Sequence, residues 1–165
     1  MEKYLKAHFK FEAMVTTIAY AATAISLLAD VIGRELFDKG IWGAPRFAVY
    51  SAIIAGFLGM SLASASGGHL RPQVLDFVVP APLDQVMNRV ADFISGLLYL
   101  GLTYLSINFV METYQNQDTA PVLDWLIWPI QLVLPYAFLS SAFHFFVTGF
   151  NPRLKDILHI GEVKQ

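Results

Sequence analysis

The sequence predicts an all-α integral membrane protein with four transmembrane helices. Hydrophobic residues make up 56% of its 165 residues and charged residues only 15%, whereas about 25% of the residues in soluble domains are charged. In lipid, only helices and closed barrels satisfy their own backbone hydrogen bonds, and a helix needs about 20 residues to cross. Four stretches lack Asp, Glu, Lys and Arg: 13–29, 47–68, 93–111 and 125–152.

These stretches predict helices because they are too long for barrel strands and lack the alternation of apolar and polar residues that such strands show. They form a single domain, residues 1–165, and we expect the first stretch to be a true span rather than a cleaved signal peptide. A short interfacial segment that ends at Pro80 is expected between the second and third spans. The spans are predicted at about 11–33, 45–68, 86–112 and 124–150.

The first span is expected to continue into a charged end. Asp30 and Arg34 are four residues apart, a spacing at which opposite charges meet on one helix face. Such a pair at a helix exit is usually structural. Gly40 and Gly43 then break the helix, and Trp42 suits an anchor at the membrane interface.

The second span carries two rows of small residues. Their spacing of about four residues puts each row on one helix face, where small side chains let another helix approach closely in lipid. Two interpretations stay open: the span packs on its own neighbours, or its ridge docks a helix of a partner subunit. The rows are Ala55, Gly59, Ala63 and Gly67, and beside them Ala52, Gly56, Ser64 and Gly68.

The last two spans differ in their prolines. No proline interrupts the third, which is expected to run from Leu83 to about Gln115. The fourth contains Pro129 and Pro135, and a proline inside a helix removes a backbone hydrogen bond, so a kink is expected there.

The distribution of cations predicts that both termini are cytoplasmic. The side of the termini carries eight Lys and Arg residues and the opposite side three, and cytoplasmic loops are the ones enriched in these residues. No basic patch indicates a nucleic-acid partner. The absence of cysteine excludes disulfides and cysteine–metal sites.

Candidate chemistry within the spans is sparse, although ionisable groups in a membrane are usually functional. His144 is the one histidine inside an uncharged stretch, and a haem would need a second histidine on a facing helix. His8, His69 and His159 fall outside the predicted spans, so no facing pair is expected. Glu12 is expected to be structural. The sequence therefore indicates no catalytic, cofactor or metal site, and a chain that is not an enzyme but supports the chemistry of another protein.

The segment after the second span, GGHLRPQVLDFVVP, resembles the signature loop of the small, Q-type (DctQ-like) membrane subunit of the TRAP transporters, the tripartite ATP-independent periplasmic transporters. In that pattern a glycine precedes a histidine, a hydrophobic residue and an arginine follow, and apolar residues lead to a proline. His69, Arg71 and Pro80 match in type and spacing, after Gly67 and Gly68.

The resemblance continues along nearly the whole chain. Arg34 matches the arginine that commonly closes the first helix, and Trp42 matches an aromatic residue ahead of the second. Gly59 fits the glycine-rich second helix, and Pro135, in the run LVLPYAF, fits a late proline in the fourth. The resemblance thus makes these residues, with the loop, the candidates for family-motif and interface positions.

The resemblance implies a small accessory subunit of a sodium-coupled, binding-protein-dependent transporter of small organic acids, in the cytoplasmic (inner) membrane of a bacterium or archaeon. In this family a large, elevator-type membrane subunit holds the substrate and sodium sites, and a periplasmic binding protein delivers the solute. The small subunit contacts lipid, supports the large subunit as a scaffold and helps dock the binding protein. Sodium is accordingly expected on the partner, and no cofactor on this chain.

Two other classes stay open at this point. One is the membrane-anchor subunit of a redox complex that uses haem or quinone. The other is a small channel or carrier that works alone by forming oligomers.

Overall fold

The computed structural model describes residues 2–65, 84–121 and 123–150, and every structural statement below concerns these residues. The described chain is helical, with one isolated antiparallel bridge and no strand, which confirms the all-α prediction. The segment predicted between the second and third spans lies outside the described residues, and so do Gly67, Gly68, His69, Arg71 and Pro80. The helices are α1 (Glu2–Phe37), α2 (Ala44–Ala65), α4 (Asp84–Asn116), α5 (Trp128–Gln131) and α6 (Val133–Phe150).

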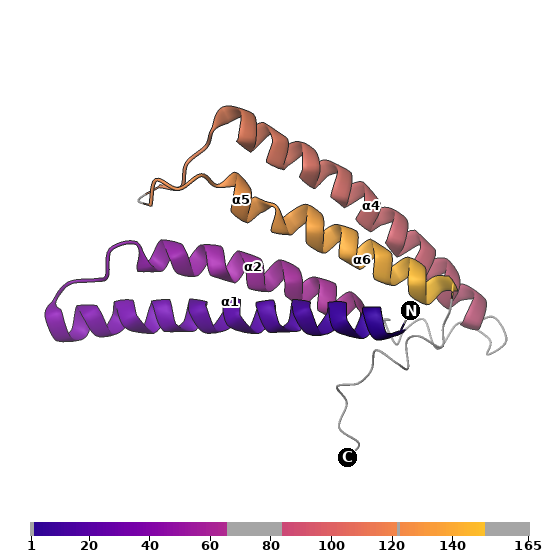
Figure 1. Ribbon diagram of the computed structural model, residues 1–165, viewed down its shortest axis with the longest axis horizontal. Coiled ribbons are helices and arrows are strands. Elements are labelled where there is room, and N and C mark those ends of the chain that lie inside the picture. The colour runs from indigo at the N-terminus through magenta and orange to yellow at the C-terminus, as the bar shows by residue number, and fades with distance from the viewer. Residues whose placement is uncertain (1, 66–83, 122, 151–165) are drawn as a thin grey trace, which may run out of the picture.

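Four helical segments are long and apolar enough to cross a membrane: α1, α2, α4 and the combined α5–α6. They lie side by side in the order α1, α2, α6, α4, and the beginning of α1 and the end of α6 are at the same end of the molecule (Figure 1). The arrangement is a row of two antiparallel hairpins joined through α2 and α6, not a bundle closed around one core.

The row buries little of each helix. The buried share of the most apolar 18-residue stretch of each helix is 17% in α1, 22% in α4, and 33% in both α2 and α5–α6. Large apolar side chains such as Ile25, Leu28, Leu97 and Leu105 are therefore exposed on the outside, where lipid or another protein can cover them.

The α1–α2 hairpin packs through small and polar residues. Along α1 the inward positions alternate in steps of four and three residues, a 3.5-residue period that keeps one seam facing a neighbouring helix. Three hydroxyls of this seam, those of Thr16, Thr23 and Ser26, donate to the carbonyl oxygen four residues earlier at 2.7–2.9 Å, so they need no partner on α2. The seam consists of Glu12, Thr16, Ala19, Thr23, Ser26, Asp30 and Gly33.

Asp30 holds the connection between α1 and α2. It is 5% exposed, forms the expected ion pair with Arg34 and accepts a hydrogen bond of 2.9 Å from the backbone N–H of Ile41. Gly43, immediately before α2, has a φ of +77°, and a Cβ there would lie 2.7 Å from Leu123 Cδ2 of the other hairpin. Glycine is favoured at this position because its positive φ is one that other residues adopt only with strain, and because Leu123 would have to move to admit a side chain.

The expected kink in the last span is confirmed as a break at Leu132, between α5 and α6. Pro135 follows three residues later, and its ring cannot donate to Gln131, the residue four positions before it. The helix resumes through the hydrogen bond from Tyr136 N–H to the Leu132 carbonyl, at 3.3 Å.

Close packing of the α4–α6 hairpin depends on Gly96. A Cβ at Gly96 would lie 3.0 Å from the ring of Phe146, whereas a Cβ at Gly101, on the same helix, would meet no heavy atom within 4 Å. We expect Gly96→Leu to destabilise the chain by about 1–3 kcal/mol, the usual cost of overpacking. Gly101→Leu is the matched control because it changes helix propensity equally. Thermal unfolding of the purified chain in detergent measures both, and equal midpoints would contradict the packing.

Candidate functional site

A buried polar cluster lies where α1, α2 and α6 converge. We call its members the Glu12 cluster: His8, Glu12, Ser61, Ser140 and His144. Glu12 is 1% exposed and His144 1%, and both are among the largest fully buried side chains in the described chain. Each residue reaches the cluster because it lies on the inward face of its helix. His8 and Glu12 are one helical turn apart on α1.

The Glu12 carboxylate joins the two hairpins. Its Oε1 accepts a hydrogen bond of 2.8 Å from Ser140 Oγ of α6, and the hydroxyl of Ser61 on α2 lies 3.2 Å from Oε2 and 3.3 Å from Oε1. The described residues place no Lys or Arg in an ion pair with it. Because burying a carboxylate without compensation is very costly, these hydroxyls are its main stabilising contacts.

His8 stands at the accessible edge of the cluster. Its side chain is 40% exposed, and its Nε2 lies 3.8 Å from Glu12 Oε1 and 3.1 Å from the hydroxyl of Tyr136. The cluster is thus open to its surroundings through the His8 imidazole, while the Glu12 end is closed.

His144 faces His8 across the boundary between α6 and α1. The two ring centroids are 6.0 Å apart, so the expectation that no histidine faces His144 is wrong. The error has a simple cause: the helix α1 starts well before the predicted span, so His8 lies within the helix although it precedes the span. Within the described chain neither His144 nitrogen has a hydrogen-bond partner, although both are buried.

The histidine pair does not favour a haem. A carboxylate oxygen of Glu12 lies close to both histidine rings, since the donor atoms of His8, Glu12 and His144 are all within 4.8 Å of one another. A porphyrin between the rings would displace this carboxylate from its serine donors. The neighbouring cavity is lined by Glu12 and Tyr136 but by neither histidine, so it offers no place for a haem with histidine ligands.

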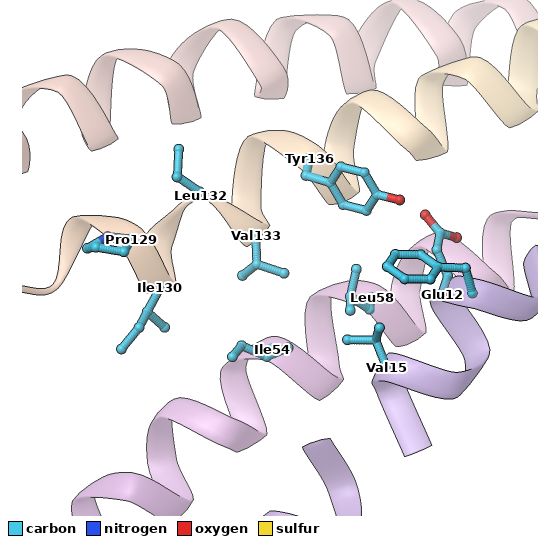
Figure 2. Close-up of a pocket in the computed structure, with 10 residues that line it drawn as sticks. Glu12, Val15, Ile54, Leu58, Pro129, Ile130, Leu132, Val133 and Tyr136 are labelled. Atoms are coloured by element: carbon cyan, nitrogen blue, oxygen red, sulfur yellow. The ribbon is translucent and has the colours of Figure 1, made fainter. Parts of the chain in front are cut away.

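That cavity, of about 510 Å³, is an apolar space between α1, α2 and α5–α6. Figure 2 shows the Glu12 carboxylate and the Tyr136 hydroxyl directed toward each other at one end. Apolar side chains line the remainder, among them Val15, Ile54 and Val133. The cavity thus gives the cluster an apolar wall on one side.

The residues singled out in the sequence lie apart from this cluster. Arg34 is at the far end of α1, paired with Asp30, and Trp42 is 74% exposed in the following connection. Gly59 faces outward, with no heavy atom within 4 Å of a Cβ built on it, and Pro135 lies beside the helix break. The structure therefore brings together a set of residues that the motif did not mark.

A signal for the cluster was present in the sequence as His8 and Glu12, four residues apart. What the sequence lacked was the pairing of α1 with α6, which brings His144 to the same level. Without it, each of these residues had an ordinary interpretation by itself.

Comparison with known proteins finds one matching family and a similar protein of the same kind. The family described as "Tripartite ATP-independent periplasmic transporters, DctQ component" matches residues 23–152. The chain is also similar to the ectoine TRAP transporter small permease protein TeaB of Halomonas elongata, with 23% identity over 140 residues, which cover 85% of this chain and 72% of that one. No solved structure matches the chain. The family match begins after His8 and Glu12 and includes the other members of the cluster.

Removal of the Glu12 side chain should loosen the junction of the hairpins. Hydrogen bonds between membrane helices contribute about 0.6 kcal/mol each and at most about 1.7, so loss of the two serine contacts in Glu12→Ala should cost about 1–3 kcal/mol. Glu35→Ala, an exposed position of the same helix, is the matched control and should leave stability unchanged. The midpoint of thermal unfolding of the purified chain in detergent measures both effects. Equal midpoints for Glu12→Ala and Glu35→Ala would contradict this role.

Proposed function

The chain belongs to the DctQ-component family of the tripartite ATP-independent periplasmic (TRAP) transporters, and on that premise we propose that it is a stationary scaffold for the large membrane subunit. The observation that carries the proposal is the flat row of four helices, most of whose apolar surface no part of the described chain covers. A row presents two broad faces to the bilayer. One can remain in lipid while the other supports a partner, which a closed bundle of this size does less well.

The helices suit a part that stays in place while another moves. The 36 residues of α1 correspond to about 54 Å of helix, against a hydrocarbon core of about 30 Å. Such a helix must tilt or project from the membrane. Trp42 and Trp125, both more than half exposed, lie at the same end of the row and suit anchors in the interface.

The outward side of α2 is the proposed contact with the large subunit. Its small residues alternate in steps of four, three and four, the pattern of a helix-packing seam. Of the described residues in the two predicted rows, only Ala55 in the first row and Ser64 in the second are buried. The outer small-residue face consists of Ala52, Gly56, Gly59 and Ala63.

The proposal extends to the partners and the energy source. The connections at 38–43 and 117–127, of which the structure describes all but residue 122, lie together at the end of the row opposite the beginning of α1 and the end of α6, as the approach of Leu123 to Gly43 indicates. With both termini cytoplasmic, these connections would face the periplasm and help dock the substrate-binding protein. On this proposal the large subunit holds the sodium and solute sites, the solute is a small organic acid, and this chain performs no catalysis.

Enlarging Gly59 should separate association from folding. Because a Cβ at Gly59 meets nothing within 4 Å, Gly59→Leu should leave the stability of the isolated chain unchanged. At an interface, however, overpacking costs about 1–3 kcal/mol, or roughly a 5- to 150-fold weaker association. Co-purification with the large subunit measures it.

The control for that variant is Gly101→Leu, which adds the same side chain to an open position of α4. It reports any general effect of an extra leucine on membrane insertion. Undiminished co-purification and uptake for Gly59→Leu would contradict the proposed contact.

Reconstitution tests the scaffold role itself. Vesicles that contain this chain alone should take up no organic acid, whereas vesicles with the large subunit as well should do so when a sodium gradient and the loaded binding protein are supplied. Flux through the chain alone would instead support a self-sufficient channel or carrier.

A further inference from the structure

We propose that His8, Glu12 and His144 form a binding site for a single transition-metal ion of the Zn²⁺ type, which fastens α6 to α1. This inference goes beyond the scaffold role and does not depend on it. The three side chains offer two imidazole nitrogens and one carboxylate oxygen, and all three donor atoms lie within 4.8 Å of one another. Zinc is commonly held by this combination of two histidines and one carboxylate, with the fourth position left to water or another ligand.

The arrangement of the donors on the helices favours chelation. His8 and Glu12, four residues apart on α1, present both donors from one helix face. His144 approaches from α6 with its ring centroid 6.0 Å from that of His8. A metal here would bind two helices that belong to different hairpins.

His144 provides an independent observation for the site. It is 1% exposed, and neither ring nitrogen has a hydrogen-bond partner within the described chain. Buried polar side chains are nearly always hydrogen-bonded. An imidazole whose unpaired nitrogen lies within 4.8 Å of a buried carboxylate oxygen and of a second imidazole nitrogen lacks a ligand that the cluster itself does not supply.

Charge supports the same conclusion. Glu12 is fully buried at the edge of a membrane span, and its ion-pair partner in the described chain is no Lys or Arg but His8, at 3.8 Å, which carries a charge only when protonated. A divalent cation would compensate the carboxylate more fully than the two serine hydroxyls do. Two imidazoles select such an ion over Mg²⁺ or Ca²⁺, which prefer oxygen ligands.

The surrounding residues already hold the carboxylate in place. Ser140 donates to Glu12 Oε1 at 2.8 Å, and Ser61 reaches Oε2 at 3.2 Å, which is the outer support that metal-binding carboxylates usually have. The hydroxyl of Tyr136, 3.1 Å from His8 Nε2, is one candidate for the fourth position, and water is another. The half-exposed His8 provides the access route for the ion.

Binding requires a small contraction of the site. Metal–ligand bonds of about 2.0–2.2 Å in a tetrahedron place neighbouring donors about 3.3–3.5 Å apart. The donors, now within 4.8 Å, would converge by up to about 1.5 Å. Rotation of the partly exposed His8 side chain can supply most of this movement, so binding needs little shift of α1 relative to α6.

The test uses the full chain, purified in mild detergent with a tag free of histidine, stripped with a chelator and titrated with Zn²⁺. We expect one ion per chain, and Co²⁺ as a substitute should give the absorption bands of tetrahedral coordination. Zn²⁺ should also raise the thermal midpoint, because a ligand that binds only the folded state stabilises it.

Variants locate the ion. His8→Gln changes the exposed member and preserves the fold, and Glu12→Gln keeps the size and one acceptor; each should weaken Zn²⁺ binding at least 100-fold and abolish the Co²⁺ bands. Ser140→Ala, which removes support of the carboxylate, should weaken it about 10- to 100-fold. His159→Gln, a histidine outside the described residues, is the matched control and should bind as the unchanged chain does.

Three results would overturn the proposal. These are the absence of stoichiometric Zn²⁺ binding by the unchanged chain, Co²⁺ bands that survive in His8→Gln, and equal losses in His8→Gln and His159→Gln. The unchanged chain suffices for the first result, so the proposal stays testable even where a variant fails to fold. Loss of association with the large subunit in Gly59→Leu is a separate readout, so failure here and failure of the scaffold role are distinguishable.

Discussion

The structure depends on how the chain accommodates the Glu12 carboxylate, which is buried where the two hairpins meet. Glu12 lies on α1 but is stabilised by a hydroxyl from α2 and another from α6. Moving α6 along α2 by one helical turn, about 5.4 Å, would withdraw Ser140 and leave the carboxylate with one hydroxyl fewer. The cost of an unsatisfied buried group therefore fixes the register between the hairpins. Apolar contacts alone could not fix it, because lipid competes equally well for apolar surface.

The same constraint explains why so much apolar surface can remain outside. Lipid gives helices no hydrophobic reason to associate, so they pack where small residues permit close contact. The α1 seam is made of small and hydroxyl residues, and its hydroxyls are satisfied within their own helix. The outer small-residue face of α2 repeats this design, and at Gly56 and Gly59 no heavy atom of the described chain lies within 4 Å of an added Cβ. The inner side of α2 is also made mostly of small and hydroxyl residues. Its neighbours can therefore pack closely against α2 in a row, without closing into a bundle.

The sequence predicts the helices well and their pairing poorly. Uncharged stretches reveal spans because charges are costly in lipid, and Pro135 reveals a break because it lacks an N–H. The Asp30–Arg34 pair is likewise local, since both residues lie on one helix. By contrast, the positions of His8, Glu12 and His144 relative to one another depend on contacts between residues more than 120 positions apart, as the hydrogen bond between residues 140 and 12 illustrates. No local sequence pattern encodes a contact between residues so far apart in the chain. A histidine ahead of the uncharged stretch therefore looks like part of a solvated helix end.

The structure also decides a question about α2 that its sequence pattern leaves open, namely which of its faces packs within the chain. A spacing of four residues in α2 fits both its inner and its outer seam, because Ala55 belongs to one and Gly59 to the other. Only the neighbours of α2 decide between them. Gly59 opens onto empty space, whereas Ala55 is fully buried.

On the proposal that this chain is a stationary scaffold, it must above all resist shear between its own halves. Contacts between apolar surfaces slide at little cost, whereas hydrogen bonds to a buried carboxylate are directional and break when the helices shift. In this chain such bonds lie at the junction of the two hairpins, near the end of the row that holds the beginning of α1. At the opposite end, Leu123 of one hairpin reaches Gly43 of the other. The hydrogen bonds of Glu12 therefore resist sliding of the two hairpins at one end of their boundary, and the fit of Leu123 against Gly43 adds a packing contact at the other.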